Sequence, residues 1–175
     1  MTPRKLALVL FAAVVGLTAL IASPAAAEYG GTGKVRTTRF TVTLTSQQTV
    51  LHQAGTDGEV TYGWNQLTGT ATSDSGDIHV EMLGNVQYVD GQGPIFGSVT
   101  LTFASQSVVG FRMKGDAAKD SSGTTNFTGT LKVLGGTAAL SQAKGGGRFT
   151  GSRSAALGSP VVLEFTIKLR GLDIS

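Results

Sequence analysis

The feature that most constrains the fold of this chain is a period-two alternation of apolar and polar residues that starts near Val35. In RFTVTLT, Phe40, Val42 and Leu44 fall on one side and threonines on the other. This pattern is typical of strands with one buried and one solvated face. Further segments of this kind are EVTYGWN, DIHVEMLGNVQYV, IFGSVTLTF, VGFRMKGD, NFTGTLKVL and VVLEFTIKL.

Turn-forming clusters separate these segments, namely GTDGE, SDSGD, VDGQGP, KDSSGT and LGSP. The only helical candidate after Ala27 is one turn at about 138–142. Around eight antiparallel strands without long crossovers leave two architectures, a closed barrel or a two-sheet sandwich. Glycine supplies 25 of 175 residues and recurs inside the strands, where it marks the bulges and sharp bends that a small barrel needs. The sequence therefore predicts an all-β fold, a single antiparallel barrel of roughly eight strands.

The first 27 residues have the three parts of a secretory signal peptide: a basic start, an apolar run from Leu6 to Ala22, and a small-residue end at Ala25–Ala27. The alternative is an uncleaved membrane anchor. The run is slightly short for a span of about 20 residues, and Pro24 precedes a good cleavage site. We therefore expect a signal peptide at 1–27, a flexible lead-in at 28–34 and a barrel domain at 35–175. The protein would be secreted, extracellular or periplasmic, with no membrane anchor after cleavage.

Charge and cysteine content exclude several classes of function. Removing Arg4 and Lys5 with the signal peptide leaves twelve Lys and Arg against eleven Asp and Glu, a formal charge of +1. With no basic tract as well, the electrostatic footprint of a nucleic-acid-binding protein is missing, so no nucleic-acid partner is predicted. The chain has no Cys, which excludes disulfides, thiolate metal sites and a cysteine nucleophile.

The stretch LGGTAALSQAKGGGRFTGSR, residues 134–153, is unusually rich in glycine. It resembles the late-chain signature of bacterial members of the allene oxide cyclase barrel family, which is related to the dirigent proteins. That signature runs approximately G-G-T-G-x-F-x-G-A-x-G-x-G-x-F-x-G. Matches fall at Gly135, Gly136, Thr137, Ala143, Gly145, Gly147, Phe149 and Gly151; departures fall at Ala138, Leu140 and Gln142. The resemblance covers roughly Phe40 to Gly171, including GSVTLTF and FTGTLKVLGGT.

The resemblance implies an eight-stranded barrel, homotrimers, and a cofactor-free cyclase or isomerase that encloses a lipophilic substrate. It also gives the glycine stretch an architectural role: a strand end, one helical turn and a return into the next strand. For residues 134–153 the alternative is a phosphate site, which the architectural role makes the less favoured interpretation. A different segment, GTGK at 31–34, superficially resembles a phosphate loop, but it lacks the preceding strand, the spacing and the Ser or Thr that such a loop requires.

If the apolar stripe lines the lumen, the strand charges point outward: His79, Glu81, Arg112, Lys114, Lys132, Glu164, Lys168 and Arg170. An eight-stranded barrel is just wide enough to be filled by side chains or to hold one small ligand. The predicted cavity is apolar and aromatic, with few polar groups. The residues expected to line it are Tyr62, Trp64, Met82, Tyr88, Phe103 and Phe111. Of these, Tyr88 is the first choice for a polar contact.

No catalytic residue can be assigned from the sequence. His79 and Glu81 share one face and could act as base and orienter, but a solvated outer face explains them better. Glu164 could enter the lumen at a bulge, although an outward position is favoured. His52 and His79 lie far apart, and no carboxylate cluster has metal-ligand spacing, so neither a metal nor a cofactor is predicted.

Three functions remain. The preferred one is an exported barrel that binds a small hydrophobic ligand in its lumen, with no assigned activity. The first alternative, implied by the resemblance, is a cyclase or isomerase that steers ring closure of a lipophilic, polyene-like substrate by orientation and water exclusion. The second is a filled structural barrel that acts through its surface.

Overall fold

The computed structural model describes residues 34–73, 76–154 and 156–171, so the predicted signal peptide lies outside the described residues. Eight strands and one short 3-10 turn make up the described fold. Their bounds are β1 Arg36–Ala54, β2 Val60–Ser73, β3 Gly76–Val89, β4 Gly93–Phe103, β5 Val108–Lys119, β6 Thr125–Gly136, η1 Ala138–Leu140, β7 Lys144–Arg153 and β8 Val161–Arg170.

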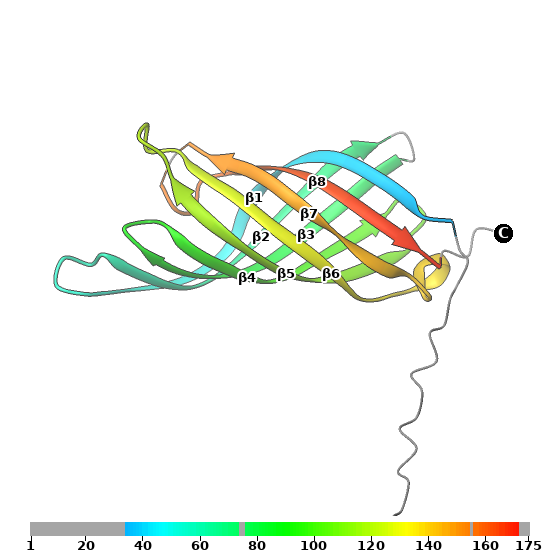
Figure 1. The fold of residues 1–175 in the computed structure, drawn as a ribbon, viewed down its shortest axis with the longest axis horizontal. Coiled ribbons are helices and arrows are strands. Elements are labelled where there is room, and N and C mark those ends of the chain that lie inside the picture. Colours follow the sequence, from blue (N-terminus) through cyan, green and yellow to red (C-terminus); the bar gives the residue numbers. More distant parts are fainter. Residues whose placement is uncertain (1–33, 74–75, 155, 172–175) are drawn as a thin grey trace, which may run out of the picture. The chain divides into compact units, whose positions relative to one another are not determined.

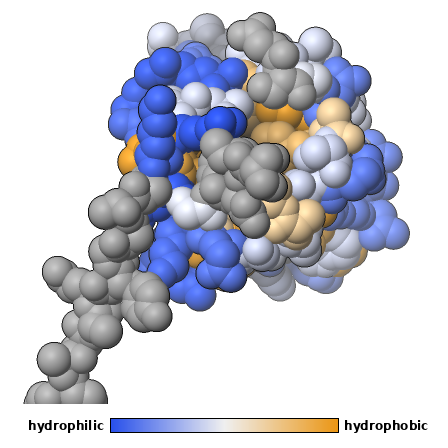
Figure 2. Space-filling view, turned by 90° about the vertical axis from the view of Figure 1, so that its right-hand side faces the viewer, coloured by the Kyte–Doolittle hydropathy of each residue, from blue (hydrophilic) through white to orange (hydrophobic). Residues whose placement is uncertain are grey.

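The strands form one closed antiparallel barrel in sequence order (Figure 1). Each strand pairs with the next, and β1 closes the sheet on β8 from Arg36↔Leu169 to Leu44↔Val161. The predicted eight-stranded barrel is thus confirmed. The turns β1–β2, β3–β4, β5–β6 and β7–β8 lie at one end, here called the loop end; η1 lies at the other, the η1 end. Figure 2 looks onto the η1 end, where apolar surface lies inside a polar rim.

The middle of the barrel is filled by side chains. Three phenylalanines meet there: the rings of Phe40 and Phe165 stack with centroids 5.2 Å apart, and Phe149 lies 5.9 Å from Phe165. Phe165 is completely buried. Aromatic pairs at these separations add about 1 kcal/mol beyond the area that they bury. The cluster ties β1, β7 and β8 together across the seam that closes the sheet.

Glycines make room for this cluster. A Cβ built on Gly129 would lie 2.3 Å from the Phe149 ring, and one built on Gly146 would lie 2.1 Å from the carbonyl oxygen of Leu131 in β6. Neither distance is compatible with a side chain. Glycine is therefore required where β6 and β7 approach closely, which is the architectural role expected for the glycine-rich stretch.

The single helical turn lies within the predicted region. Its first residue, Ala138, has φ +49°, in the left-handed region that favours glycine. The backbone N–H of Leu140 donates to the Thr137 carbonyl at 2.9 Å, and that of Ala143 donates to the Leu140 carbonyl at 2.9 Å. These bonds turn the chain from β6 into β7. Ala138 is one of the departures from the glycine signature described above. The positive φ gives a physical reason for glycine at that position of the signature.

One face assignment made from the sequence is wrong. The alternation places Tyr62 and Trp64 on the inner side of β2, but the buried residues of this strand are Asn65, Leu67 and Ala71, of the opposite parity. Tyr62 is 45% exposed and stacks on His52, its partner in β1, with ring centroids 5.3 Å apart. The β1–β2 hairpin extends past the rest of the barrel (Figure 1). Alternating apolar residues in this part of the hairpin therefore need not face the core.

The glycine stretch offers a test of this packing within a single motif. Gly146→Ala should lower the free energy of unfolding by about 3 kcal/mol or more, because the new methyl group meets backbone that cannot move without breaking the β6–β7 pairing. Gly135→Ala is the matched control, since nothing lies within 4 Å of its Cβ position; it should be neutral or stabilise by up to about 1 kcal/mol. Urea unfolding measures both. Equal effects would contradict the close-approach explanation.

Candidate lumen site

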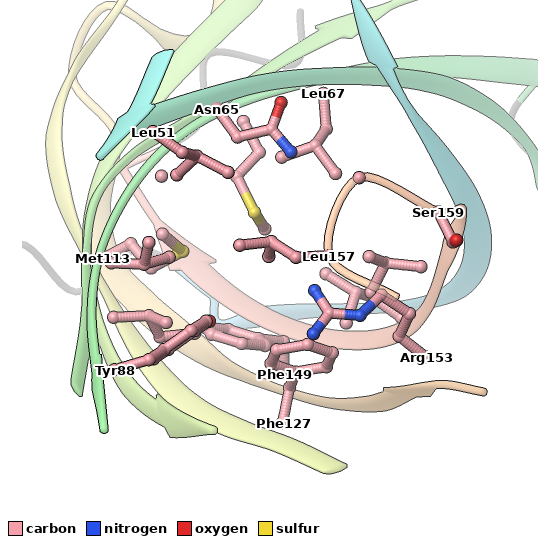
Figure 3. A pocket seen from close by; sticks show the side chains of 17 residues that line it. Leu51, Asn65, Leu67, Tyr88, Met113, Phe127, Phe149, Arg153, Leu157 and Ser159 are labelled. Carbon is pink, nitrogen blue, oxygen red and sulfur yellow. The ribbon is translucent and has the colours of Figure 1, made fainter. Parts of the chain in front are cut away.

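A small cavity lies in the loop-end half of the lumen (Figure 3). We call it the Arg153 cavity. Its volume is about 60 Å³, and its walls are predominantly apolar. It is lined by Leu51, Asn65, Leu67, Met82, Gly84, Val86, Tyr88, Ile95, Met113, Phe127, Phe149, Arg153, Leu157, Gly158, Ser159, Val161 and Leu163. Ligand pockets usually enclose about 300–1,000 Å³, so most of this lumen is occupied by the protein's own side chains.

Arg153 is the distinctive polar group of the cavity. It ends β7 and is only 6% exposed. Its guanidinium carbon lies 5.5 Å from the centroid of the Phe127 ring, and Nη2 donates to the Thr125 hydroxyl at 3.4 Å. Burial lowers the pKa of Arg153, and the nearby Tyr88 phenol partly offsets this. Arginine nevertheless stays protonated in proteins, so a positive charge lines an otherwise apolar space.

Tyr88 supplies a second polar group. It lies on β3 and is 2% exposed. Burial raises the pKa of its phenol to about 12, and the positive charge of Arg153 acts in the opposite direction. At neutral pH the hydroxyl is therefore a neutral group that can donate or accept a hydrogen bond.

Asn65 is the third polar group, on the opposite wall. Its Oδ1 accepts hydrogen bonds from the hydroxyls of Ser46, at 2.5 Å, and Thr49, at 2.9 Å. These donors flank the register shift in β1 between Ser46 and Gln48. The side chain thus holds the β1 irregularity in place, and its amide nitrogen is directed toward the cavity (Figure 3).

The β7–β8 loop closes the cavity. Leu157 reaches from this loop toward the middle of the lumen, where it packs against the core although it is only partly buried (Figure 3). Gly158, with φ +98°, and Ser159 complete this wall. The described residues of this loop belong to no strand, so we expect the loop to be the part of the site that opens most readily.

The six residues expected to line a cavity are found in four different places. Met82 and Tyr88 line the Arg153 cavity. Phe111 is completely buried in the core away from that cavity, and Phe103 lines a hollow at the η1 end. Tyr62 and Trp64 lie on the outward-facing side of β2.

The hollow at the η1 end has a volume of about 220 Å³. It is lined by Arg36, Thr38, Ser73, Ile78, Phe103, Ser105, Ser107, Ala139, Leu140 and Leu169. Its hydroxyl groups bond locally; the Ser105 hydroxyl, for example, donates to that of Ser107 at 3.1 Å. The charged group at this end, Arg36, is exposed. The hollow therefore lacks the buried charge that marks the Arg153 cavity.

The strand charges considered for catalysis lie on the outer surface. His79 and Glu164 are exposed, and Glu81 is partly buried and accepts a hydrogen bond from Gln66 Nε2 at 2.5 Å. Residues 34–73, 76–154 and 156–171 contain no group of three or more potential metal ligands. Among the same residues no helix has the length and apolar character needed to cross a bilayer.

Comparison with known proteins gives no relative from which a role could be transferred: no family model, curated protein or solved structure matches the chain. The resemblance to the allene oxide cyclase barrel family therefore remains a prediction.

Arg153 was not among the residues expected from the sequence. The signal that could have found it is the continued alternation Phe149, Gly151, Arg153, which places the arginine on the same side of β7 as a core phenylalanine. Because charged residues are almost never fully buried, the alternation was not extended to Arg153 as part of the inner face.

The raised pKa of Tyr88 predicts a loss of stability in alkali. The pKa of the phenol is near 10 in the unfolded chain and about 12 in the folded one. The contribution of Tyr88 to the free energy of unfolding is therefore complete below pH 10 and is lost between about pH 10 and 12. A difference of two units corresponds to about 3 kcal/mol. Tyr88→Phe should remove this part of the pH dependence, measured as the free energy of unfolding in urea. Tyr62→Phe, at an exposed tyrosine, should leave it unchanged.

Proposed function

We propose that this barrel binds a small hydrophobic ligand with an acidic head group in the loop-end half of its lumen. The observation that carries the proposal is the buried guanidinium of Arg153 beside an apolar cavity. The apolar walls would receive the hydrocarbon part of the ligand. Arg153 would receive its carboxylate, while Tyr88 and Asn65 offer further hydrogen bonds.

The preference for an acid follows from the surroundings of Arg153. Inside a protein an ion pair is stronger than in water, and a guanidinium matches a carboxylate with two parallel N–H···O bonds. Hydrogen bonds to charged groups contribute about 1.5–3 kcal/mol each. An acid should thus bind more tightly than the alcohol with the same chain.

The size of the cavity requires the β7–β8 loop to move on binding. About 60 Å³ holds roughly two water molecules, each of which takes about 30 Å³ in the liquid. Withdrawal of Leu157 would join the cavity to the loop end and make room for a short hydrocarbon chain.

Two methionines provide a direct measurement. Met82 and Met113 both line the cavity, and Met1 is the only other methionine in the chain. Hexanoate and octanoate should shift the NMR signals of these two ¹³C-labelled methyl groups in a saturable way. The alcohols with the same chain lengths should bind with affinities about tenfold lower.

Arg153→Met should abolish the difference in affinity between each acid and the matched alcohol, because methionine fills a similar space but carries no charge. Arg112→Met, the same substitution at an exposed site on β5, should leave it intact. Circular dichroism would establish that both variants fold. An unchanged preference for acids in folded Arg153→Met would refute the assigned role of Arg153.

Leu157→Ala tests the loop separately. If ligand must displace this side chain, its truncation should raise the affinity for octanoate about tenfold, since less apolar surface has to be uncovered. Leu134→Ala, at an exposed leucine on β6, should have no effect. A lower affinity in Leu157→Ala would mean that Leu157 belongs to the binding surface rather than blocking it.

The small volume favours a second candidate, the filled barrel that acts through its outer surface. The NMR measurement distinguishes this filled barrel from a ligand-binding one. A filled barrel should show no ligand-induced shift at Met82 and Met113, either in the unmodified protein or in Leu157→Ala.

A further inference from the structure

The charges of the described residues are segregated around the barrel. Eight exposed cations lie on the outer face of β5 to β8 and the adjoining part of β1: Arg39, Arg112, Lys114, Lys132, Lys144, Arg148, Lys168 and Arg170. In the described part of the chain none of them forms an ion pair. We call this surface the basic face.

The acids of the described residues lie elsewhere or at its border. Asp57, Glu59, Asp77, Glu81 and Asp90 belong to the β1–β2 turn, β3 and the β3–β4 turn, and Asp120 belongs to the β5–β6 turn. Asp116 and Glu164 border the basic face toward the loop end, in the row Asp116–Thr128–Thr150–Glu164. The basic face therefore keeps its positive field although the chain as a whole is nearly neutral.

Strand register extends this face to an aromatic residue on β4. Successive partners from β4 to β7 are Phe96, Lys114, Thr130 and Arg148. Neighbours in such a row are about 4.8 Å apart. Phe96 is 41% exposed. We call this the Phe96–Arg148 row.

Two open grooves lie along this surface and share Arg148. One, of about 700 Å³, runs over β4 to β7 from Pro94 and Phe96 to Thr150, and its lining includes one acid, Asp116, in the register row toward the loop end. The other, of about 650 Å³, crosses β7 and β8 and has cations on both sides, among them Lys144 and Lys168. Glycines form part of the lining of both grooves, at Gly115 and Gly129 in the first and at 145–147 in the second.

One glycine opens the outer surface directly. Gly146 lies on the outer side of β7, between Lys132 on β6 and Lys168 on β8. A Cβ there would lie 2.1 Å from the Leu131 carbonyl oxygen. The close approach of β6 and β7 thus requires glycine at this position, and the surface is left open between two long cationic side chains.

We infer that the basic face binds a linear acidic polysaccharide along the Phe96–Arg148 row. The cations would pair with carboxylates or sulfates on successive sugars. Phe96 offers a ring face to the C–H side of a sugar, and Thr130 can bond to a hydroxyl group. The inference uses outer residues alone and is independent of ligand binding in the lumen.

Other polyanions fit this surface less well. The row has a single aromatic residue, Phe96, whereas single-stranded nucleic acid calls for several aromatic side chains on which successive bases stack. Lys132 on β6 and Lys168 on β8 flank Gly146 two strand spacings apart, about 10 Å, which suits one polymer chain lying between them rather than a duplex. An anionic membrane is flat and cannot enter a groove.

Titration of the purified protein with polygalacturonate by isothermal calorimetry tests the inference. We expect binding that weakens as salt is raised, and none to neutral dextran. Arg148→Gln, in both grooves, should weaken binding about tenfold. Lys119→Gln removes the same charge from an exposed site on β5 outside both grooves and should change it less than about twofold.

Phe96→Ala should also weaken binding severalfold at every salt concentration, whereas Leu134→Ala should not. Three results would overturn the inference: no binding of polygalacturonate at low salt, equal losses in Arg148→Gln and Lys119→Gln, or tighter binding of oligo(dT), duplex DNA or phosphatidylglycerol vesicles than of polygalacturonate. In every variant the Met82 and Met113 methyl signals should keep their response to octanoate, so failure here leaves the lumen proposal untouched.

Discussion

Packing of Phe149 beneath Gly129, inside a sheet closed by β1 and β8, is the constraint on which the rest of the structure depends. An eight-stranded barrel has room in its middle for little more than its own side chains. Phe40, Phe149 and Phe165 occupy that space, and the strands around them can approach only where glycine replaces a side chain. The same packing confines the Arg153 cavity to the loop end. The close approach of β6 and β7 at Gly146 leaves the outer surface open at that position.

The interior and the exterior of the barrel therefore offer different chemistry. Inside, one guanidinium faces a small apolar space closed by Leu157, an arrangement suited to a compact ligand with an acid group. Outside, exposed cations and Phe96 lie along open grooves, an arrangement suited to an extended partner. The polar and charged groups offered to the two ligands are different, because successive side chains of a strand point to opposite sides of the sheet. Among the described residues, only Ile95 and Phe149 line both the cavity and the first groove.

How far the site could be predicted depended on where each residue lies along its strand. Met82 and Tyr88, two of the residues expected to line a cavity, both line the Arg153 cavity, and β3, which carries them, alternates without interruption. Tyr62 and Trp64 were misplaced because β2 begins in a hairpin that extends past the barrel, where apolar residues need not face a core. Arg153 was missed because a buried charge contradicts the pattern that identifies an inner face.

The all-β class, the antiparallel order and the need for glycine in the region 134–153 follow from the amino-acid sequence, because alternation, turn chemistry and backbone conformation are local properties. Only the tertiary structure decided that the lumen is nearly filled, that Arg153 points into it, and that a chain with little net charge gathers its cations on one face. Those features depend on which strands become neighbours and in what register, and pairing across a closed sheet is set by the packing of the whole core.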